Sequence, residues 1–430
     1  MRVGVVGLWH LGSVTAACLA KAGYPVIAYD PDQTTIANCQ QGQAPVYEPQ
    51  LKELLTAGKQ AGKLHFTSQP ADLAQAEVVW ITFDTPVDDR DIADVEFVKS
   101  AILRVLPHLH DQTLLLISSQ VPVGTTRELA DYCALHYPQK NLTFAYSPEN
   151  LRLGKAIHVF TKPERIVVGL QTEADKKRVQ RLLQPFTQHI IWMSIESAEM
   201  TKHALNAFLA VSVVFINELA TLCERVGADA REVERGLKSE ERIGAKAYLR
   251  PGAAIAGGTL ARDVNFLVQT GIQQEVATPL FSAMLASNEA HKQWVCQRLL
   301  NILKSLKDKT ITTLGLTYKA DTDTLRRSTA VEICAWLKQQ GAKVIAYDPA
   351  IKELPAALSE IIELKPTIEE ALHQADAVLV TTEWPEFTAL SAEALLAQVK
   401  QAIVFDASGF LMQAIGCDER IQYYSVGRQA

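Results

Sequence analysis

The feature that most constrains the fold is an alternation of short, apolar, β-branched runs with amphipathic stretches along the first third of the chain. The apolar runs are RVGVVG (2–7), PVIAYD (25–30), EVVWITF (77–83), TLLLISS (113–119) and ERIVVGL (164–170). Apolar runs separated by segments of helix length are typical of βαβ units, whose parallel strands are buried on both faces. The first part of the chain is therefore predicted to be a doubly wound α/β domain.

The last third of the chain repeats this pattern. Its strand-like runs are KTITTLG (309–315), AKVIAYD (342–348), DAVLVTT (376–382) and AIVFDAS (402–408). The stretch AGYPVIAYDPD (22–32) has a close counterpart in QGAKVIAYDPA (340–350), so a unit of helix, glycine and strand ending in an acid occurs twice. We expect a second Rossmann-like, doubly wound domain at the carboxyl end.

Between these parts lies one long helical stretch, ESAEMTKHALNAFLAVSVVFINELATLCERVG, which covers 196–227. Apolar residues recur at helical spacing, and Gly227 is a natural C-terminal stop. The middle is apolar on nearly all sides, which predicts burial on more than one side, as the spine of a central domain or as a subunit interface. We expect three domains, with residues 1–195 and 301–430 joined by a central helical domain of residues 196–300.

Composition excludes several classes of protein. The hydrophobic share of 48% and charged share of 21% are ordinary for a soluble α/β protein, no apolar run approaches the roughly 20 residues of a membrane span, and the first residues do not resemble a secretory signal. The net charge of -6, without a block of Lys or Arg, gives no long-range attraction to nucleic acid. The seven cysteines stand singly without any CxxC pair, which argues against a disulfide framework and a metal site. We expect a cytoplasmic protein.

The first candidate site is a glycine turn between the first strand and the first helix. It reads Gly7-Leu8-Trp9-His10-Leu11-Gly12, and an acid, Asp30, ends the second strand. This layout is typical of a dinucleotide fold, in which the helix N-terminus faces the pyrophosphate and the acid binds the ribose hydroxyls, so Asp30 favours NAD over NADP. Trp9 stands where the second glycine of GxGxxG is usual, which weakens the motif. The alternative is a Rossmann-like sheet that no longer binds a dinucleotide.

The second candidate site is a pair of polar residues at the start of the long helix. Lys202 and Asn206 are four residues apart and so share one helix face. Lys202 could serve as a base toward an alcohol while Asn206 fixes its oxygen. The alternative is a solvated lysine and a capping asparagine. We expect His203, between them, to be a packing residue.

The third candidate is Glu149, in the stretch YSPENLRLG. It follows a predicted strand, and doubly wound folds bind their ligands at the carboxyl ends of parallel strands. Glu149 is therefore a candidate catalytic or sugar-binding group. Read alone, SPEN is equally the N-terminus of a helix with an acid in its first turn.

Over nearly its whole length the chain resembles the UDP-glucose/GDP-mannose dehydrogenases, which oxidise the C6 alcohol of a nucleotide sugar to a carboxylate with two NAD. The resemblance rests on a long series of stretches in one order: APVYEPQLKELL (44–55), DTPVDD (84–89), VPVGTT (121–126), SPENLRLGKAIHVFTKPERIVVG (147–169), AEMTKHALNAFLAVSVVFINELA (198–220), ERIGAKAYLRPG (241–252), LGLTYKADTDTLRRSTAVEI (314–333) and VTTEWPEF (380–387).

The resemblance implies a role for each part of the chain. The first domain is expected to bind NAD, with Thr85 and Gln120 on the cofactor side, and the long helix is expected to form a homodimer. The last domain is expected to bind the UDP-sugar. The glycine-rich segment YLRPGAAIAGGTLARDVNFL (248–267) has the glycine density of a loop that closes on a ligand. The substrate-binding residues implied by this segment and by the resemblance are Tyr248, Arg250, Gly257, Gly258, Lys319 and Arg326.

The chain departs from the family where the second oxidation takes place. The family's loop GG[ST or H]CxxxD carries a cysteine that attacks the aldehyde, whereas GGTLARD (257–263) is one residue shorter and offers only Thr259 or Leu260 there. Asp263, which closes that motif, is kept. A hydroxyl is a much poorer nucleophile than a thiol because its pKa is far higher. Gln120 also replaces a threonine that positions water, Leu153 replaces a second glutamate, and DASG (406–409) lacks an arginine of the family's DGRN.

These losses affect thioester formation and hydrolysis and spare alcohol oxidation. We therefore expect an NAD-dependent nucleotide-sugar oxidoreductase in which Lys202 takes the C6 hydroxyl proton, Asn206 and Asp263 arrange the site, and Glu149 orients the sugar or a water. The product is expected to be the aldehyde, or an acid formed by slow oxidation of its hydrate. The alternatives are a four-electron dehydrogenase by another route, a non-catalytic nucleotide-sugar binding protein, and an epimerase that retains NAD.

Overall fold

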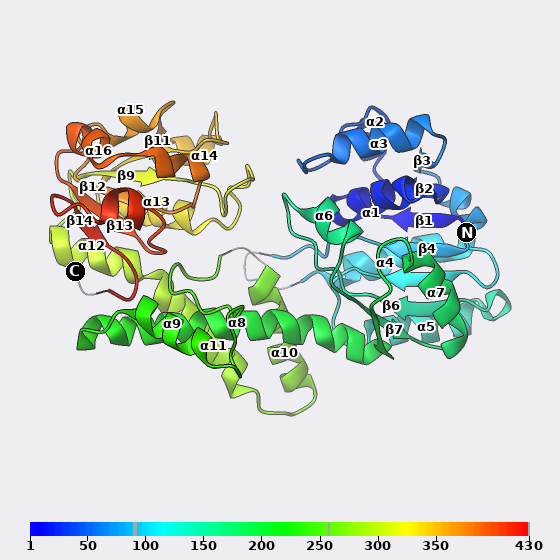
Figure 1. The fold of residues 1–430 in the computed structure, drawn as a ribbon. Helices are drawn as coiled ribbons and strands as arrows, with labels where there is room; N and C mark the ends of the chain where they lie inside the picture. The colour runs from blue at the N-terminus through cyan, green and yellow to red at the C-terminus, as the bar shows by residue number, and fades with distance from the viewer. Residues whose placement is uncertain (89–92, 257–258, 429–430) are drawn as a thin grey trace. The chain divides into compact units, whose positions relative to one another are not determined.

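The computed structural model describes residues 1–88, 93–256 and 259–428, and the chain divides into two compact units, Met1–Leu205 and Asn206–Ala430 (Figure 1). Each unit contains one sheet built from the runs that the sequence predicts as strands. The division into three domains at residues 195 and 300 stays a prediction. Gly257 and Gly258 lie outside the described residues.

The sheet of the first unit has eight strands in the order β3-β2-β1-β4-β5-β6-β7-β8. The first six are parallel in the order typical of dinucleotide-binding folds, whereas β7 pairs antiparallel with β6 and parallel with β8. The run ERIVVGL therefore forms a strand of reversed direction, which the periodicity alone could not indicate. The strands are β1 (Val3–Val6), β2 (Val26–Tyr29), β3 (Leu64–Thr67), β4 (Val78–Ile81), β5 (Leu114–Ile117), β6 (Thr143–Tyr146), β7 (Ile166–Leu170) and β8 (Ile190–Ser194).

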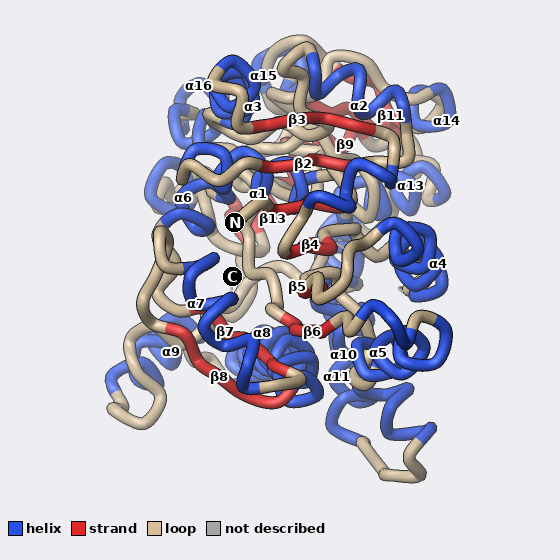
Figure 2. The backbone as a smooth tube through the Cα atoms, turned by 90° about the vertical axis from the view of Figure 1, so that its right-hand side faces the viewer, coloured by secondary structure: helices blue, strands red, loops and turns tan. Residues whose placement is uncertain are grey.

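Helices cover both faces of this sheet. α1, α6 and α7 lie on one face, and α4 and α5 on the other (Figure 2). Each face has its own apolar core because the strands carry apolar side chains on both sides. The helices are α1 (His10–Lys21), α2 (Gln33–Gln40), α3 (Leu51–Gln60), α4 (Val95–Val105), α5 (Thr125–His136), α6 (Ala156–Thr161) and α7 (Lys176–Leu183).

The long central helix, α8, runs from Ile195 to Val226 and belongs to both units. It ends where the sequence predicts, because Gly227 has φ +78 and so adopts the left-handed conformation of a helix stop. By length and composition α8 qualifies as a membrane span, contrary to our expectation that no stretch would. Only 44% of its most apolar window is buried inside the protein.

The second unit combines several helices with a six-stranded parallel sheet. The strand order β11-β10-β9-β12-β13-β14 repeats the order of the first six strands of the other unit. Helices α10 and α11 pack on α8 through a small apolar cluster, and α12 and α13 cover one face of the sheet. The elements are α9 (Ala230–Ser239), α10 (Thr259–Gln273), α11 (Pro279–Lys292), α12 (Trp294–Leu303), β9 (Thr310–Leu314), α13 (Thr329–Gln339), β10 (Lys343–Tyr347), α14 (Ala356–Ser359), β11 (Ile362–Leu364), α15 (Ile368–Leu372), β12 (Ala377–Val380), α16 (Ala392–Gln398), β13 (Ile403–Asp406) and β14 (Gln422–Tyr424).

Candidate active site

The glycine turn requires glycine at both of its ends. Gly7 has φ +94, a conformation that side chains other than glycine rarely adopt. At Gly12 the reason is space, because a Cβ there would lie 1.7 Å from the carbonyl oxygen of Gly7. Helix α1 therefore starts directly against the end of β1. Its first N–H groups, from His10 onward, have no partner within the helix and suit the diphosphate of a dinucleotide.

Trp9 does not disturb this turn. Its φ of -72 is ordinary for any residue, so the backbone needs no glycine there. The Trp9 side chain is 51% exposed. The backbone of the turn therefore tolerates a tryptophan at this position, and a role of the turn in binding NAD stays a prediction.

Asp30 lies at the carboxyl end of β2 and stabilises the turn. Its Oδ2 accepts a hydrogen bond from the Leu8 amide at 2.7 Å, and its Oδ1 accepts one from the Asp32 amide at 3.0 Å. Burial raises the pKa of the Asp30 carboxyl above its usual range, although these two bonds act in the opposite direction. Each carboxylate oxygen retains a second lone pair, which could accept from the ribose hydroxyls that the motif predicts.

Thr85 and Gln120 lie beyond the carboxyl ends of neighbouring strands, β4 and β5. Both residues are buried, and the Thr85 hydroxyl donates to the backbone carbonyl of Gln120 at 2.5 Å. The structure therefore brings these two expected cofactor residues together at the carboxyl ends of the strands, where ligands bind in this fold.

Glu149 and Lys202, which lie 53 residues apart in sequence, are in direct contact. The Lys202 ammonium donates to the Glu149 carbonyl oxygen at 2.5 Å and lies 3.6 Å from its carboxylate. Lys202 is only 5% exposed, so it is not the solvated lysine of the alternative interpretation. The Glu149 carboxylate also accepts from the Leu151 amide at 2.8 Å, which fixes its orientation.

Two further residues of α8, which the sequence did not single out as functional, hold the loop that follows β5. Glu199 accepts hydrogen bonds from the amides of Gly124 and Thr126 and from the Thr126 hydroxyl, at 2.6, 3.0 and 2.6 Å. His203 Nε2 lies 2.9 Å from the Val121 carbonyl and is buried, in agreement with the packing role expected for it. The face of α8 that carries Lys202 is thus attached to the 121–126 loop.

A small cavity of about 80 Å³ lies beside Glu149. Leu11 of the glycine turn and Glu149 line the same cavity, together with the apolar side chains of Trp80, Phe160 and Phe186. The cofactor turn and the Glu149 segment therefore meet at one place within the first unit.

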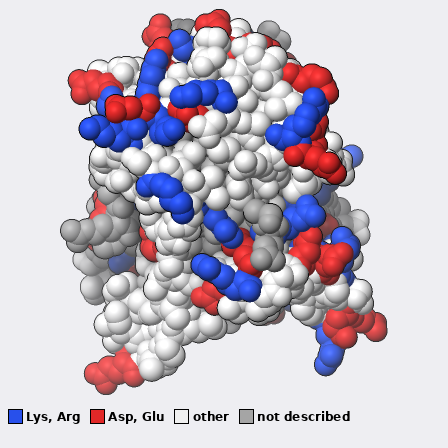
Figure 3. Space-filling model, turned by 90° about the vertical axis from the view of Figure 1, so that its left-hand side faces the viewer, with Lys and Arg blue, Asp and Glu red and all other residues white. Residues whose placement is uncertain are grey.

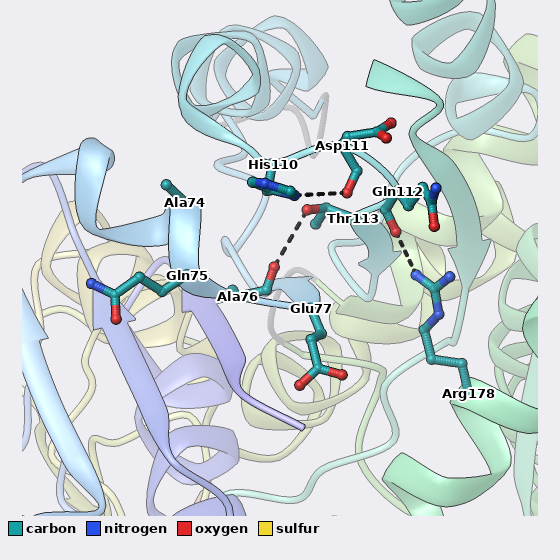
Figure 4. Close-up of a pocket in the computed structure, with 9 residues that line it drawn as sticks. All are labelled: Ala74, Gln75, Ala76, Glu77, His110, Asp111, Gln112, Thr113 and Arg178. Carbon is teal, nitrogen blue, oxygen red and sulfur yellow. Dashed lines mark hydrogen bonds between the residues drawn. The ribbon is translucent and has the colours of Figure 1, made fainter. Parts of the chain in front are cut away.

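A larger but shallow hollow, of about 450 Å³, lies at the opposite ends of the strands of the same sheet (Figure 4). Its charged groups are already engaged: Arg178 donates to the Gln112 carbonyl at 2.7 Å, and Glu77 pairs with the amino terminus at 3.3 Å. Ligands of doubly wound folds bind at the carboxyl ends of the strands, whereas this hollow adjoins the amino ends of β4 and β5. We do not place the active site there.

Asn206 and Asp263 form a second buried pair. The Asn206 amide donates to the Asp263 carboxylate at 2.5 Å, and the two residues are 5% and 0% exposed. Asn206 follows Lys202 by one turn of α8, and Asp263 lies in the first turns of α10. The capping interpretation of Asn206 is wrong, since its side chain contacts another helix.

The segment expected to correspond to the family's cysteine loop is helical from Thr259 onward. Helix α10 begins at Thr259, so both candidate positions lie in its first turn. Thr259 is exposed, and Leu260 packs against the apolar cluster formed by α8, α10 and α11. Neither side chain is a nucleophile comparable with a thiolate.

The substrate residues expected in the second unit are exposed or half-buried. Tyr248 is 59% exposed, and Arg250 donates to the Ser408 carbonyl at 3.2 Å beside the DASG segment. The Lys319 ammonium lies 5.7 Å from the centre of the Tyr318 ring, and Arg326 is exposed. Among the described residues there is no group of three His, Cys, Asp or Glu that could hold a metal ion.

Profiles of three domains of one family match the chain in order. They describe the UDP-glucose/GDP-mannose dehydrogenase family and cover its NAD-binding domain (residues 1–187), its central domain (196–290) and its UDP-binding domain (312–413). The chain belongs to the UDP-glucose/GDP-mannose dehydrogenase family. Like other members it is an NAD-dependent nucleotide-sugar dehydrogenase, and its cofactor is NAD.

Individual members of the UDP-glucose/GDP-mannose dehydrogenase family resemble the chain over its full length. It is 34% identical to UDP-glucose 6-dehydrogenase TuaD of Bacillus subtilis, covering 100% of this chain and 94% of the relative. It is 32% identical to a UDP-glucose 6-dehydrogenase of Rhizobium meliloti, covering 100% of both chains. The structure of a UDP-glucose dehydrogenase from Pyrobaculum islandicum matches with a TM-score of 0.89 and 27% identity, over 99% of this chain and 98% of the other.

Proposed function

We propose that the protein oxidises the C6 hydroxyl of a UDP-sugar of the UDP-glucose type and releases the aldehyde as its product. The observation that carries this proposal is that the chain has residues suited to the first oxidation, of the alcohol, but no suitable nucleophile at the position expected for the second, of the aldehyde. The groups suited to alcohol oxidation are paired, as Lys202–Glu149 and Asn206–Asp263, and all of them except the half-buried Glu149 are buried. The position of the family's nucleophile falls on Thr259 and Leu260, in the first turn of α10.

The alcohol step needs a base for the hydroxyl proton. Lys202 takes this proton in its neutral amine form, directly or through a water, because a protonated ammonium has no lone pair to accept it. The Glu149 carbonyl fixes the buried amino group in place. Asn206 holds the substrate oxygen, and Asp263 fixes the Asn206 amide in the required orientation. Glu149 orients the sugar or a water. Bound NAD supplies the acceptor for the hydride that leaves C6.

The second oxidation lacks a covalent route. A thiolate would attack the aldehyde and make the second hydride available from a thiohemiacetal, but the Thr259 hydroxyl has a pKa far above that of a thiol, and the Leu260 side chain is apolar. Without that intermediate the aldehyde leaves, or its hydrate is oxidised slowly.

The remaining substrate contacts are proposed from the resemblance. The arginine and lysine residues Arg250, Lys319 and Arg326 bind the nucleotide part, and Tyr248 and the glycines at 257 and 258 approach the sugar. On the face of the protein drawn in Figure 3, basic and acidic side chains are interspersed in small groups. This face therefore offers no broad field of one sign to attract a charged ligand.

We propose that two copies associate through α8. Phe208, Phe215 and Leu222 follow one another at intervals of seven residues on this helix and are 73%, 50% and 61% exposed. A stripe of large apolar side chains at this spacing is typical of a helix that packs against another helix. A cytoplasmic homodimer agrees with this surface and with the free, mostly buried cysteines.

The test is to incubate the purified protein with NAD and a panel of UDP- and GDP-sugars, to count the NADH formed per sugar consumed, and to weigh the product by mass spectrometry. We expect one NADH and a product that has lost two hydrogen atoms. Two NADH and an acid would show that the chain completes the second oxidation without a thiol. Binding without NADH would indicate a binding protein, and an isomerised sugar without net NADH would indicate an epimerase.

A further inference from the structure

Glu48 is a buried carboxylate that none of the steps above uses. The residue is 5% exposed and precedes α3. Its Oε2 accepts a hydrogen bond from the Gly154 amide at 2.8 Å and lies 3.0 Å from His10 Nε2, while its Oε1 accepts one from the Ala156 amide at 2.9 Å. Three groups converge on this carboxyl, and His10 acts as the third donor in the tautomer with its hydrogen on Nε2.

The three donors belong to the two segments that build the active site of the first unit. His10 is the first residue of α1 and lies inside the glycine turn. Gly154 and Ala156 end the segment that begins at Pro148 and carries Glu149, and Ala156 is also the first residue of α6. Helices α1 and α6 lie side by side (Figure 1).

This arrangement makes Glu48 the polar connection between the two segments. Beyond it, Leu11 and Glu149 face the same small cavity, so a displacement of the turn or of the segment would alter that cavity. A buried carboxylate that loses one of its donors becomes costly, because its charge is then poorly solvated. The free energy of its bonds therefore favours states in which the turn and the segment are both in place.

We propose that Glu48 is a positioning residue that couples NAD binding at the glycine turn to the order of the segment carrying Glu149. The inference rests on the proposed function in one respect, because it takes the start of α1 as the NAD site. NAD that fixes the turn holds His10 against Glu48, and Glu48 then holds the amides of Gly154 and Ala156. By linkage, an ordered segment tightens NAD binding to the same extent.

The coupling can be measured by amide hydrogen exchange in peptides that cover residues 148–160, with and without saturating NAD. The amides of Gly154 and Ala156 report directly, since Glu48 accepts their hydrogen bonds. In the wild-type protein we expect NAD to slow exchange in these peptides by about tenfold, a change of the size usual for coupled sites. NAD affinity is measured in parallel by titration calorimetry.

Two variants separate coupling from folding. Glu48→Gln keeps the shape but replaces one acceptor by a donor, which must then face either the Ala156 amide or the amide of Gly154 and the ring of His10. His10→Phe removes only the link to the turn and leaves both amide bonds of Glu48. The matched control is Glu53→Gln, which makes the same change of charge at an exposed position of α3.

With His10→Phe we expect exchange without NAD to match the wild type, whereas NAD slows it by less than twofold and binds about tenfold more weakly. Glu48→Gln should expose the amides even without NAD and should also lose the response to NAD. Glu53→Gln should behave as the wild type. A full NAD response in both Glu48→Gln and His10→Phe, or none in a wild-type protein that binds NAD, overturns the inference and leaves the proposed function standing. A wild-type protein that does not bind NAD overturns both.

Discussion

Asp30 and Asp348 occupy equivalent places in the two sheets and hold equivalent turns. Asp30 Oδ2 accepts from the Leu8 amide at 2.7 Å, and Asp348 Oδ2 accepts from the Leu316 amide at 2.6 Å. Asp30 directly follows β2, which pairs with β1, and Asp348 directly follows β10, which pairs with β9. In both copies of the AYDP repeat, the aspartate therefore fixes the neighbouring glycine turn by accepting a hydrogen bond from its backbone.

The two acids differ in what remains available to a ligand. Asp348 is 1% exposed and also accepts from the Thr317 amide at 3.0 Å and from Trp384 Nε1 at 3.2 Å. Asp30 is half-buried and has fewer protein partners for its oxygens. We therefore expect Asp348 to serve mainly stability, and Asp30 to serve both stability and the recognition of NAD.

Asparagine at each position should separate these roles. Asp348→Asn places an amide against several donors and should lower the free energy of unfolding by about 2–3 kcal/mol, the usual value for hydrogen bonds to a buried charge. Asp30→Asn should affect stability less but weaken NAD binding by about tenfold. Thermal unfolding and NAD titration of both variants measure the two effects, and an Asp30→Asn protein with unchanged NAD affinity would contradict the assignment.

The Asn206–Asp263 pair allows a swap experiment. Asp263→Asn replaces the charged acceptor of the Asn206 amide by a neutral and weaker one, and Asn206→Asp places two carboxylates in a site that is at most 5% exposed. Each change should therefore destabilise the protein and lower kcat by about a hundredfold. The double variant Asn206→Asp with Asp263→Asn restores one donor facing one carboxylate. We expect it to regain most of the stability but little of the kcat. Recovery of both would show that this pair is only structural.

Thr259→Ala should leave kcat and the number of NADH per sugar unchanged within about twofold, because the hydroxyl is exposed and has no activating base among the residues that the structure describes. Product analysis by mass spectrometry measures this. A matched control is Thr270→Ala, which removes a hydroxyl further along α10 that donates to the Phe266 carbonyl. Loss of an acid product in Thr259→Ala alone would assign this hydroxyl a chemical role.

Local features of the chain could be predicted from its sequence. The turn at Gly7 and the end of α8 at Gly227 follow from glycines that adopt φ +94 and +78. Lys202 and Asn206 share a helix face because they are four residues apart. The glycine-rich stretch was predicted less well, because glycines up to residue 258 indicated a loop that continues beyond it. Instead a helix begins at Thr259, and Leu260 in its first turn packs against an apolar cluster.

Contacts between distant segments could not be predicted. Glu48 lies 38 residues from His10 and 106 from Gly154, and periodicity contains no information on such pairs. Glu199 was similarly hidden, since its partners lie in the loop at Gly124. Both acids stand in stretches that resemble the family, but a resemblance gives a position and not the partner that the side chain binds.

The exposed stripe of α8 predicts that Phe215→Glu prevents dimerisation. A charge at this position, which is 50% exposed in the single chain, would lie against apolar side chains of the second copy. Light scattering coupled to size-exclusion chromatography should show a monomer. Leu135→Glu, at another exposed apolar position that lies on α5, is the control and should not change the mass. A dimer that persists in Phe215→Glu places the interface elsewhere.

Glu199 predicts a distinct dependence of stability on pH. Burial raises the pKa of its carboxyl above 4.5 in the folded protein, even though the bonds from Thr126 and Gly124 act in the opposite direction. A raised folded-state pKa means that the stabilising contribution is full below the unfolded-state pKa and is lost as the pH rises through the folded-state pKa. Glu199→Gln does not titrate. The free energy of unfolding of the wild type, minus that of the variant, should therefore fall as the pH rises above about 4.5 and then become constant. Denaturant titrations at a series of pH values measure this difference. A difference that grows with pH would show that the three hydrogen bonds outweigh burial and that Glu199 holds the 121–126 loop as a stabilised anion.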